Sequence, residues 1–341
     1  MTGGRVAGLL LAAAALVAAA PSRDLPRDLP RRAIFTGADP AALVEGDRVW
    51  LYPTDGGERL FAWSSTDLNR WRRSRPLIER TSIPWIPAAE VDRRFLWAPH
   101  MAAANGRWYL YYSLGPQEPQ PSMIGVAVCD TPAGPCRDSG RPLVDGSDSD
   151  KVAARPAAGC PDGMAPTGSG RYRFEAIDPM VFVDPKSGRR LLYAGGSNGS
   201  TLRAWELAPD MVTALREVPI DQPPCFTEGA WMHERDGTYY LSYRSGHYDR
   251  SDYSVRYATS STPTGPWTYR GTVLSSGGGY NGPGHHAFFR DPRSGKWVMT
   301  YHRWEGQAGD GPYRNTQRQV ALAPVRYGAD GTILPIALDA R

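Results

Sequence analysis

The 341-residue sequence lacks several features that would direct it toward common protein classes. It has no CxxC motif and no Cys/His spacing of the zinc-finger kind, so a structural zinc site is not predicted. Beyond residue 20, no apolar run approaches the roughly 20 residues that a membrane-spanning helix needs. The net charge of +4 is small, and the arginines that supply nearly all of the positive charge are scattered. We therefore expect neither nucleic acid nor a membrane as a partner.

The one long apolar run lies at the N-terminus. Residues 6–20 are almost wholly Leu, Ala and Val, a positive charge precedes them at Arg5, and small residues before Pro21 offer a cleavage site. This pattern predicts a secretory signal peptide over residues 1–20. Residues 21–32, rich in Arg, Pro and Asp, are predicted to be a disordered lead-in. A secreted protein, extracellular or periplasmic, with a folded domain over residues 33–341 is the resulting expectation.

Cysteine is also scarce, with four residues. In an oxidising compartment they are expected to pair, and three connectivities are possible. Cys129 and Cys136 flank a Pro/Gly turn and could staple a hairpin, which would leave Cys160 and Cys225 to each other.

Convincing helical periodicity is missing. The segment 202–216 has an amphipathic pattern, but Pro209 argues against a helix there. Short β-branched and aromatic runs preceded by Gly- or Asp-containing turns are common instead, as in RVWLYP, RWYLYYSL, RRLLYAGG, TYYLSYR and KWVMTYH. The chain is therefore predicted to be all-β.

These strands recur together with companion segments. Three aromatic strands are followed by a polar turn, in FAWSSTDLNRW, VAVCDTPAGPC and RYATSSTPTGPW. Five short segments with polar first residues precede the aromatic strands: ADPAAL, WAPHMA, IDPMVFV, EGAWMH and GHHAFF. The spacing leaves room for four strands per unit, with residues 145–171 as a surface insertion. Five such units predict a five-bladed β-propeller, in which the first strand of each blade lines a central channel.

Three of the five segments would bring a carboxylate to that channel. Asp-Pro is a common turn opener, so any one of these residues is weak support for a site. Together, however, Asp39, Asp178 and Glu228 would repel one another and lose hydration, which stability alone does not favour and which tuning of pKa values for catalysis requires. The pattern points to acid/base chemistry.

At these residues the sequence resembles glycoside hydrolase family 43, the five-bladed propellers that hydrolyse arabinose- and xylose-containing plant polysaccharides. The resemblance runs from about Ala33 to the C-terminus, through ADP, WAP, IDPMVFVD, TEGAW and GPGHH. It implies inversion of configuration without a required cofactor. It also implies that Asp39 is the general base, that Glu228 is the general acid, and that Asp178 orients Glu228 and raises its pKa.

Sugar faces stack on flat aromatic rings, so Trp97 is expected to stack on the sugar, with Trp231 as a second candidate. The resemblance implies that Arg318 and His285 contact substrate. The family places a histidine like His285 near a hydrated calcium ion in the channel. Since calcium prefers oxygen ligands, waters would supply most of the shell, and a buried histidine bonded to blade backbone is the alternative.

Two positions depart from the family pattern: His100 follows WAP where an acidic residue is usual, and Ala230 replaces the proline of EGP. The function expected is an exported, monomeric glycosidase for arabinose- or xylose-containing glycans. An α-L-arabinofuranosidase comes first, a β-xylosidase second, and an endo-arabinanase shares the same core. Two alternatives stay open, a related retaining fructosidase clan and a sugar-binding propeller without catalysis.

Overall fold

The computed structural model describes residues 1, 29, 32–117, 121–146, 160–161, 174–197, 200–314 and 317–338. Residues 2–20 of the predicted signal peptide, nearly all of the lead-in and most of the insertion lie outside the described residues. Those assignments stay predictions. Among the helices of the described ranges, none combines the length and apolar character needed to cross a membrane.

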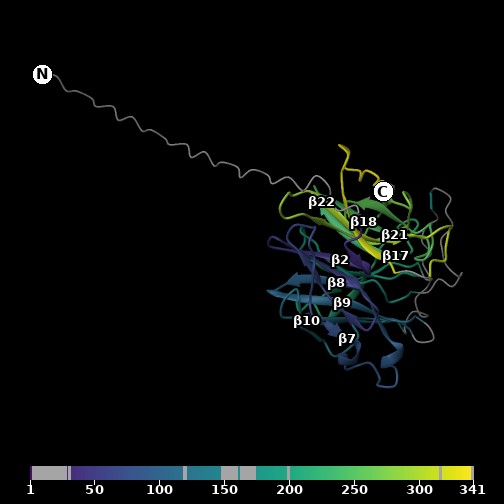
Figure 1. Ribbon diagram of the computed structural model, residues 1–341. Helices are drawn as coiled ribbons and strands as arrows, with labels where there is room; N and C mark the ends of the chain where they lie inside the picture. The colour runs from purple at the N-terminus through teal and green to yellow at the C-terminus, as the bar shows by residue number, and fades with distance from the viewer. Residues whose placement is uncertain are drawn as a thin grey trace.

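Five antiparallel sheets form five blades, so the predicted five-bladed β-propeller is confirmed (Figure 1). Blade 1 contains β2 (Ala38–Glu45), β3 (Arg48–Thr54), β5 (Trp63–Ser65) and β6 (Arg72–Arg73). Blade 2 contains β8 (Phe95–Ala104), β9 (Arg107–Gly115), β10 (Met123–Cys129) and β11 (Cys136–Asp138), with β12 (Val144–Asp145) also paired to β10. Blade 3 contains β13 (Met180–Val183), β14 (Arg190–Ala194), β15 (Arg203–Leu207) and β16 (Ala214–Val218). No helix forms over 202–216, where β15 and β16 lie instead.

Blades 4 and 5 complete the ring. Blade 4 contains β17 (Glu228–Arg235), β18 (Thr238–Ser245), β19 (Ser254–Ser260) and β20 (Thr268–Leu274). Blade 5 contains β21 (Tyr280–Arg290), β22 (Trp297–Glu305), β23 (Gln319–Pro324) and β1 (Phe35–Thr36). A small ribbon of β4 (Arg59–Leu60) and β7 (Ile78–Glu79) and two 3-10 turns, η1 (Arg80–Ser82) and η2 (Val91–Arg93), lie between blades 1 and 2 in the chain.

The ring closes because its last blade is built from both ends of the domain. β1 pairs with β23, Phe35 opposite Val320, so the N-terminal strand completes the C-terminal blade. Around the channel each innermost strand contacts the next, from β2 through β8, β13, β17 and β21 back to β2. Closure leaves no long open sheet edge.

The repeated turns noted in the sequence join the third and fourth strands of their blades. Tyrosines on second strands reach across to the turn between the third and fourth strands of the next blade. The hydroxyl of Tyr52 donates to the carbonyl of Pro132, that of Tyr111 to Met211, and that of Tyr193 to Pro263. Each phenol body is buried while its polar tip is hydrogen-bonded. Aromatic strands and polar turns therefore recur together because they connect neighbouring blades.

Each innermost strand, or the residues just before it, has a residue in the left-handed region of backbone space near the site. These residues are Asp39 (φ 49°), Ala98 (φ 39°), Asp178 (φ 57°), Gly229 (φ 60°) and His285 (φ 43°). In β2, β8, β17 and β21 the pairing register shifts at the same point. Such bulges re-aim side chains, and non-glycine residues adopt this conformation at a cost of about 1–3 kcal/mol. The backbone is therefore specialised at the same place in all five blades.

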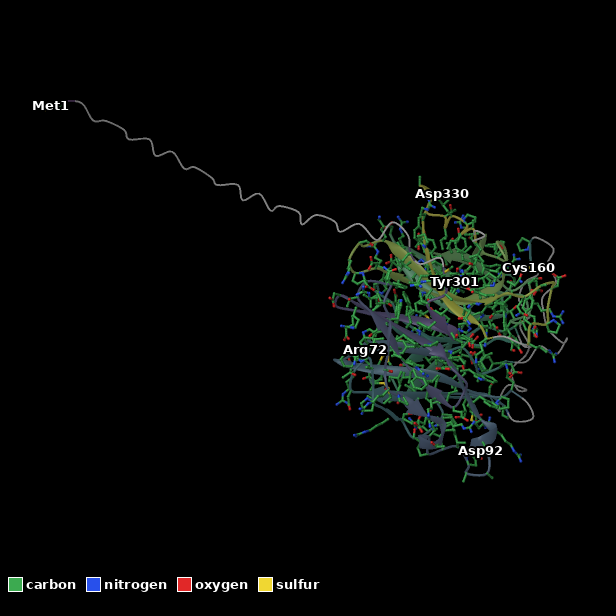
Figure 2. All side chains as sticks on the ribbon, viewed as in Figure 1. Met1, Arg72, Asp92, Cys160, Tyr301 and Asp330 are labelled. Carbon is green, nitrogen blue, oxygen red and sulfur yellow. A yellow bond between two sulfur atoms is a disulfide. The ribbon has the colours of Figure 1, made fainter. Side chains whose placement is uncertain are left out.

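Two disulfides join Cys129 to Cys136 and Cys160 to Cys225, which is the connectivity that the Pro/Gly turn between Cys129 and Cys136 suggested. Cys129 and Cys136 face each other across β10 and β11 and are bonded. Cys160, at the periphery of the molecule (Figure 2), is bonded to Cys225. The second disulfide ties the insertion to the segment that leads into Glu228.

Candidate active site

Four of the residues predicted from the sequence meet at one end of the channel. Asp39 is in β2, Asp178 lies just before β13, Glu228 begins β17 and His285 is in β21. The Nδ1 atom of His285 lies 3.2 Å from Oδ1 of Asp39 and 3.9 Å from Oδ2 of Asp178. The backbone N–H of Gly229, next to Glu228, donates to Oδ2 of Asp178 at 3.1 Å. Four blades thus contribute to a single polar cluster.

Asp39 is held in its ionised form. Its Oδ1 accepts a hydrogen bond of 2.9 Å from Nη1 of Arg318 and lies close to His285. Burial alone would raise the pKa of Asp39, but the positive charge of Arg318, followed by His285, outweighs burial and keeps this pKa well below its usual range. Asp39 is therefore a carboxylate throughout the neutral and mildly acidic range.

His302 of β22 supports Asp39 through the backbone. The N–H of Asp39 donates to Nδ1 of His302 at 3.0 Å, so this nitrogen carries a lone pair and cannot also donate to the carboxylate 3.3 Å away. Burial lowers the pKa of His302 to about 3, so the ring is neutral. His302 therefore fixes the strained backbone of Asp39 without pairing with its charge.

Asp178 has the opposite electrostatic environment. Burial raises its pKa, His285 partly opposes this, and the negative charges of Glu228 and Asp39 raise it further, to about 7. Its backbone N–H donates to Oγ of Ser113 in blade 2 at 2.8 Å. Two aspartates in one cluster thus have pKa values displaced in opposite directions, a pattern that separates acid and base roles in active sites.

Glu228 is half-buried and is held from two sides. The hydroxyl of Tyr253 donates to its Oε1 at 2.7 Å. Gly196 lies so close that a Cβ atom there would come within 2.3 Å of Cβ of Glu228. The absence of a side chain at position 196 is thus what leaves space for Glu228.

A buried guanidinium lies behind this cluster. Arg244 pairs with Glu228 across β17 and β18 and is fully buried. Burial lowers its pKa, while Tyr253, Glu228 and Asp178 oppose that shift. Nη1 of Arg244 donates to Nδ1 of His286 at 2.7 Å, so the proton of His286 is on Nε2, 2.6 Å from Oγ of Ser242. Arg244 therefore brings positive charge close to the carboxyl cluster. It is bonded to His286, whose two ring nitrogens both have hydrogen-bond partners.

The two tryptophans predicted to contact sugar differ in exposure. Trp97 is half-buried, with its indole against the backbone of Gly115, where a Cβ would come within 2.1 Å of the ring. Trp231 is 8% exposed, and its ring lies 5.4 Å from that of His100. Trp97 thus has more of its surface available than Trp231.

His100, which stands where an acidic residue is usual, is a neutral structural group. Its Nε2 lies 3.1 Å from the carbonyl oxygen of Val181, which joins β8 to β13. Burial lowers its pKa to about 4. The polar contact of blade 2 with blade 3 is therefore made without a charge.

Arg318 also approaches an exposed aromatic ring. Its guanidinium carbon lies 5.7 Å from the ring centroid of Tyr248, which is 47% exposed. Since Arg318 contacts Asp39, Tyr248 lies one side chain away from the base and is partly open to solvent. Planar exposed rings are suited to stacking on sugars.

The contacts of His285 are with two carboxyl groups. Its Nδ1 faces the carboxylates of Asp39 and Asp178, a contact that is favourable when this nitrogen carries a proton. Among the described residues, no group of three or more His, Cys, Asp or Glu side chains is arranged to hold a metal ion. The donor set at this position therefore fits a hydrogen-bonding histidine, which contacts carboxylates and not the blade backbone.

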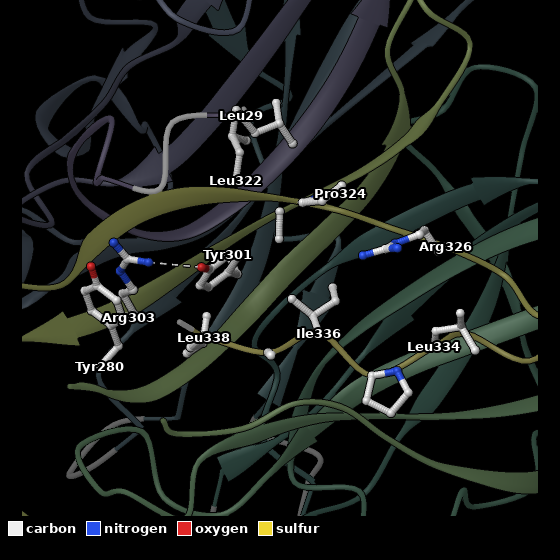
Figure 3. Close-up of a pocket in the computed structure, with 13 residues that line it drawn as sticks. Leu29, Tyr280, Tyr301, Arg303, Leu322, Pro324, Arg326, Leu334, Ile336 and Leu338 are labelled. Carbon is white, nitrogen blue, oxygen red and sulfur yellow. Dashed lines mark hydrogen bonds between the residues drawn. The ribbon is translucent and has the colours of Figure 1, made fainter. Parts of the chain in front are cut away.

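A cavity of about 540 Å³ lies elsewhere, between β22, β23 and the segment 334–338 (Figure 3). Its walls combine apolar side chains, among them Leu29, Leu322, Ile336 and Leu338, with polar groups that include Arg303 and Arg326. Arg303 at its edge donates to the hydroxyl of Tyr301 at 3.2 Å. None of the predicted site residues lines this cavity, so it is separate from the carboxylate cluster.

Sequence reasoning missed several members of the cluster: Ser113, Arg244, Tyr253, His302 and the pairing of Arg318 with Asp39. Tyr253, Arg244 and His302 occur in strand-like runs whose other members are core residues, so no local signal distinguishes them. Only the positions of the blades bring them to the site.

A five-bladed propeller with a base-like and an acid-like carboxyl group at one channel mouth defines a class of glycoside-cleaving enzymes. The protein family model for glycosyl hydrolases family 43 matches residues 33–152 and 164–333. The chain belongs to this family of inverting glycoside hydrolases. The retaining fructosidase alternative is thereby wrong, and a propeller without catalysis is not supported.

The relatives cover most of the chain. It is 31% identical to a β-D-galactofuranosidase of Aspergillus niger, over 79% of this chain and 75% of that protein. It is 28% identical to an arabinoxylan arabinofuranohydrolase of Bacillus subtilis, over 89% of this chain and 63% of that one. Among solved structures, an α-L-arabinofuranosidase from Clostridium thermocellum superposes with a TM-score of 0.63 at 28% identity, covering 88% of this chain and 93% of that one.

Proposed function

We propose that the protein is an exported, inverting glycosidase for arabinose- and xylose-containing glycans. The activity that we propose first is that of an α-L-arabinofuranosidase. The observation that carries this proposal is the contrast between an ionised Asp39 and a carboxyl cluster around Asp178 and Glu228 across one channel mouth. The activities of the arabinofuranosidase relatives support the sugar. A β-xylosidase is the second candidate, supported by xylosidase/arabinosidase relatives, and an endo-arabinanase is the third.

In this proposal Asp39 is the general base. It takes a proton from a water molecule as the water oxygen attacks the anomeric carbon. Glu228, the general acid, gives its proton to the glycosidic oxygen as the carbon–oxygen bond breaks, and the product sugar has the inverted configuration. The contact of Arg318 with Asp39 supports the first role, because a base must be unprotonated before it can act.

Asp178 is proposed to orient Glu228 and to raise its pKa. Its acceptance of the Gly229 N–H supports the orienting role, since this bond fixes the peptide that follows Glu228. A neighbouring negative charge favours the protonated form of an acid, which is the form that Glu228 needs before the reaction.

Trp97 is proposed to stack on the sugar, with Trp231 second, and Arg318 and His285 are proposed to contact sugar hydroxyl groups. The greater exposure of Trp97 supports its precedence. A structural calcium ion in the channel remains a prediction of the family resemblance, and no step of the proposed reaction uses it. The two disulfides are in keeping with export to an oxidising compartment, and a monomer is expected.

Release of 4-nitrophenol from the α-L-arabinofuranoside, the β-D-xyloside and the β-D-galactofuranoside tests this proposal. The third substrate is included because of the galactofuranosidase relative. We expect the arabinofuranoside to be hydrolysed fastest, and Asp39→Ala to reduce kcat/KM on it by about 10²- to 10⁴-fold. Glu228→Ala should cause a loss of about that size with the methyl α-L-arabinofuranoside, whose leaving oxygen must be protonated. Asp92→Ala, in which an exposed carboxyl is removed, is the control.

Nuclear magnetic resonance of the first product identifies the anomer formed. Inversion predicts β-L-arabinose from the α-L-arabinofuranoside. Retention of configuration, or full activity in folded Asp39→Ala, would contradict the roles of Asp39 and Glu228. Preference for the galactofuranoside would correct the sugar and leave the roles of the carboxyl groups intact.

A further inference from the structure

Tyr253 is a buried phenol with one partner at the site. It is 0% exposed, and its hydroxyl donates to Oε1 of Glu228 at 2.7 Å. Within the described ranges, this carboxyl oxygen is the acceptor found for that hydroxyl. Because a buried O–H group without an acceptor is destabilising, the phenol proton is directed at Oε1.

The ring that carries this hydroxyl is held in place by neighbours from two blades. The imidazole of His302 lies nearly parallel to it, with centroids 5.8 Å apart and planes inclined by 9°. The guanidinium carbon of Arg244 lies 5.5 Å from its centroid. Gly284 lies beside it, and a Cβ atom there would come within 2.3 Å of Cε1 of the ring. The phenol therefore has little freedom to turn away from Glu228.

A protonated carboxyl group has one oxygen that carries the proton and one that accepts hydrogen bonds. Since Oε1 accepts from Tyr253, the proton of Glu228 is placed on Oε2. We propose that Tyr253 is a positioning residue that selects Oε2 as the proton-donating oxygen of the general acid and sets the plane of its carboxyl group. This inference rests on the proposed role of Glu228.

The step transfers a single proton. The Oε2–H bond of Glu228 breaks as the leaving oxygen takes the proton, and the electron pair of that bond stays on the carboxylate. Tyr253 keeps its own proton, because burial, reinforced by the charge of Glu228, raises its pKa well above the usual range. Its hydrogen bond to Oε1 persists and becomes charge-assisted once Glu228 is ionised.

Tyr253 also connects the acid to the base. His302, whose ring faces Tyr253, accepts the backbone N–H of Asp39. One aromatic pair therefore spans the two halves of the site, and the position of the Glu228 proton is set relative to the backbone of Asp39.

A series of leaving groups tests the assignment with Tyr253→Phe, which removes one oxygen atom. A 4-nitrophenyl glycoside needs little protonation of its leaving oxygen, whereas a methyl glycoside or a sugar-linked substrate needs much. We expect kcat/KM to fall about 10- to 100-fold with the methyl glycoside and by less than about 3-fold with the 4-nitrophenyl glycoside. The ratio of the two rates on one sample is the readout, so a partly folded preparation still reports it.

Tyr193→Phe is the matched control, because that buried phenol bonds to the carbonyl of Pro263 between blades 3 and 4. It should lower stability and leave the ratio unchanged. Gly284→Ala displaces the Tyr253 ring while keeping its hydroxyl, and we expect it to change the ratio in the same direction as Tyr253→Phe.

An equal loss with both leaving groups, or no loss with either, overturns the assignment to Tyr253. The Glu228→Ala variant separates this failure from failure of the proposed function. If its own loss does not depend on the leaving group, Glu228 is not the acid, whatever Tyr253 does.

Discussion

At the scale of single residues, the pKa values of two aspartates in the site differ because only one of them, Asp39, is bonded to an arginine. Arg318 contacts Asp39 directly and lowers its pKa, whereas burial, with the negative charges of Glu228 and Asp39, raises the pKa of Asp178 to about 7 although His285 opposes the shift. Arg244, below the cluster, limits the cost of burying three carboxyl groups together. Identical chemical groups thus acquire different protonation states from their neighbours.

This assignment predicts a shift in the pH dependence of activity. Arg318→Met removes the largest influence that lowers the pKa of Asp39, so the folded-state pKa of Asp39 rises. The base is active only when ionised, and the acidic limb of kcat/KM should therefore move to higher pH, by roughly 1–3 units. A pH profile of kcat/KM from about pH 3 to 8 measures the shift.

Arg318→Lys keeps the charge and should move the limb less, while Arg326→Met, at the exposed edge of blade 5, is the control. An unmoved acidic limb in Arg318→Met would show that another group sets the pKa of that limb.

The same linkage affects stability. The depressed pKa of Asp39 stabilises the fold above the unfolded pKa of about 3.9, and this contribution is lost as pH falls through the folded pKa. Arg318→Met should lose part of that acid resistance.

At the scale of elements, four of the five innermost strands, β2, β8, β17 and β21, have a bulge at the residue in the left-handed conformation. Asp39 and His285 use the left-handed conformation to direct polar side chains into the cluster, whereas Ala98 takes the same conformation with only a methyl group. Strain at Ala98 therefore follows from the repeated blade geometry and not from a polar role of its own side chain.

Ala98→Gly should stabilise the protein, because glycine adopts φ near 39° without the Cβ penalty. After the extra entropy of an unfolded glycine is subtracted, we expect a gain of about 0.5–1 kcal/mol in the free energy of unfolding. Ala103→Gly, exposed in the same strand, should cost about 0.5–1 kcal/mol. Denaturant unfolding of both variants gives the comparison, and a loss of stability in Ala98→Gly would contradict the strain argument.

At the scale of the whole molecule, three features stabilise the ring: closure of blade 5, hydrogen bonds of tyrosine hydroxyls between blades, and two disulfides. The disulfides enclose loops of different length. The Cys129–Cys136 bond spans 7 residues within one hairpin, and the Cys160–Cys225 bond spans 65 residues between the insertion and blade 4. Loop-closure entropy of the unfolded chain grows with the length that a disulfide spans.

The paired replacements Cys160→Ala with Cys225→Ala should therefore lower the free energy of unfolding by about 4 kcal/mol, against about 2.5 kcal/mol for Cys129→Ala with Cys136→Ala. Denaturant unfolding of the oxidised proteins measures both. Equal losses, or a larger loss for the hairpin pair, would rule out loop closure as the main contribution.

The sequence alone determined the architecture, because strand period, turn chemistry and five recurring segments are local patterns that a propeller repeats. It also singled out Asp39, Asp178, Glu228 and His285, since polar residues at the start of apolar strands are conspicuous in one dimension. Ser113, Tyr253 and His302 were hidden, because serine, tyrosine and histidine within strands look like ordinary core or rim residues. Only the folding of five blades around one channel decided that these side chains meet the carboxyl groups, and that Arg318 lowers the pKa of Asp39 while burial raises the pKa of Asp178.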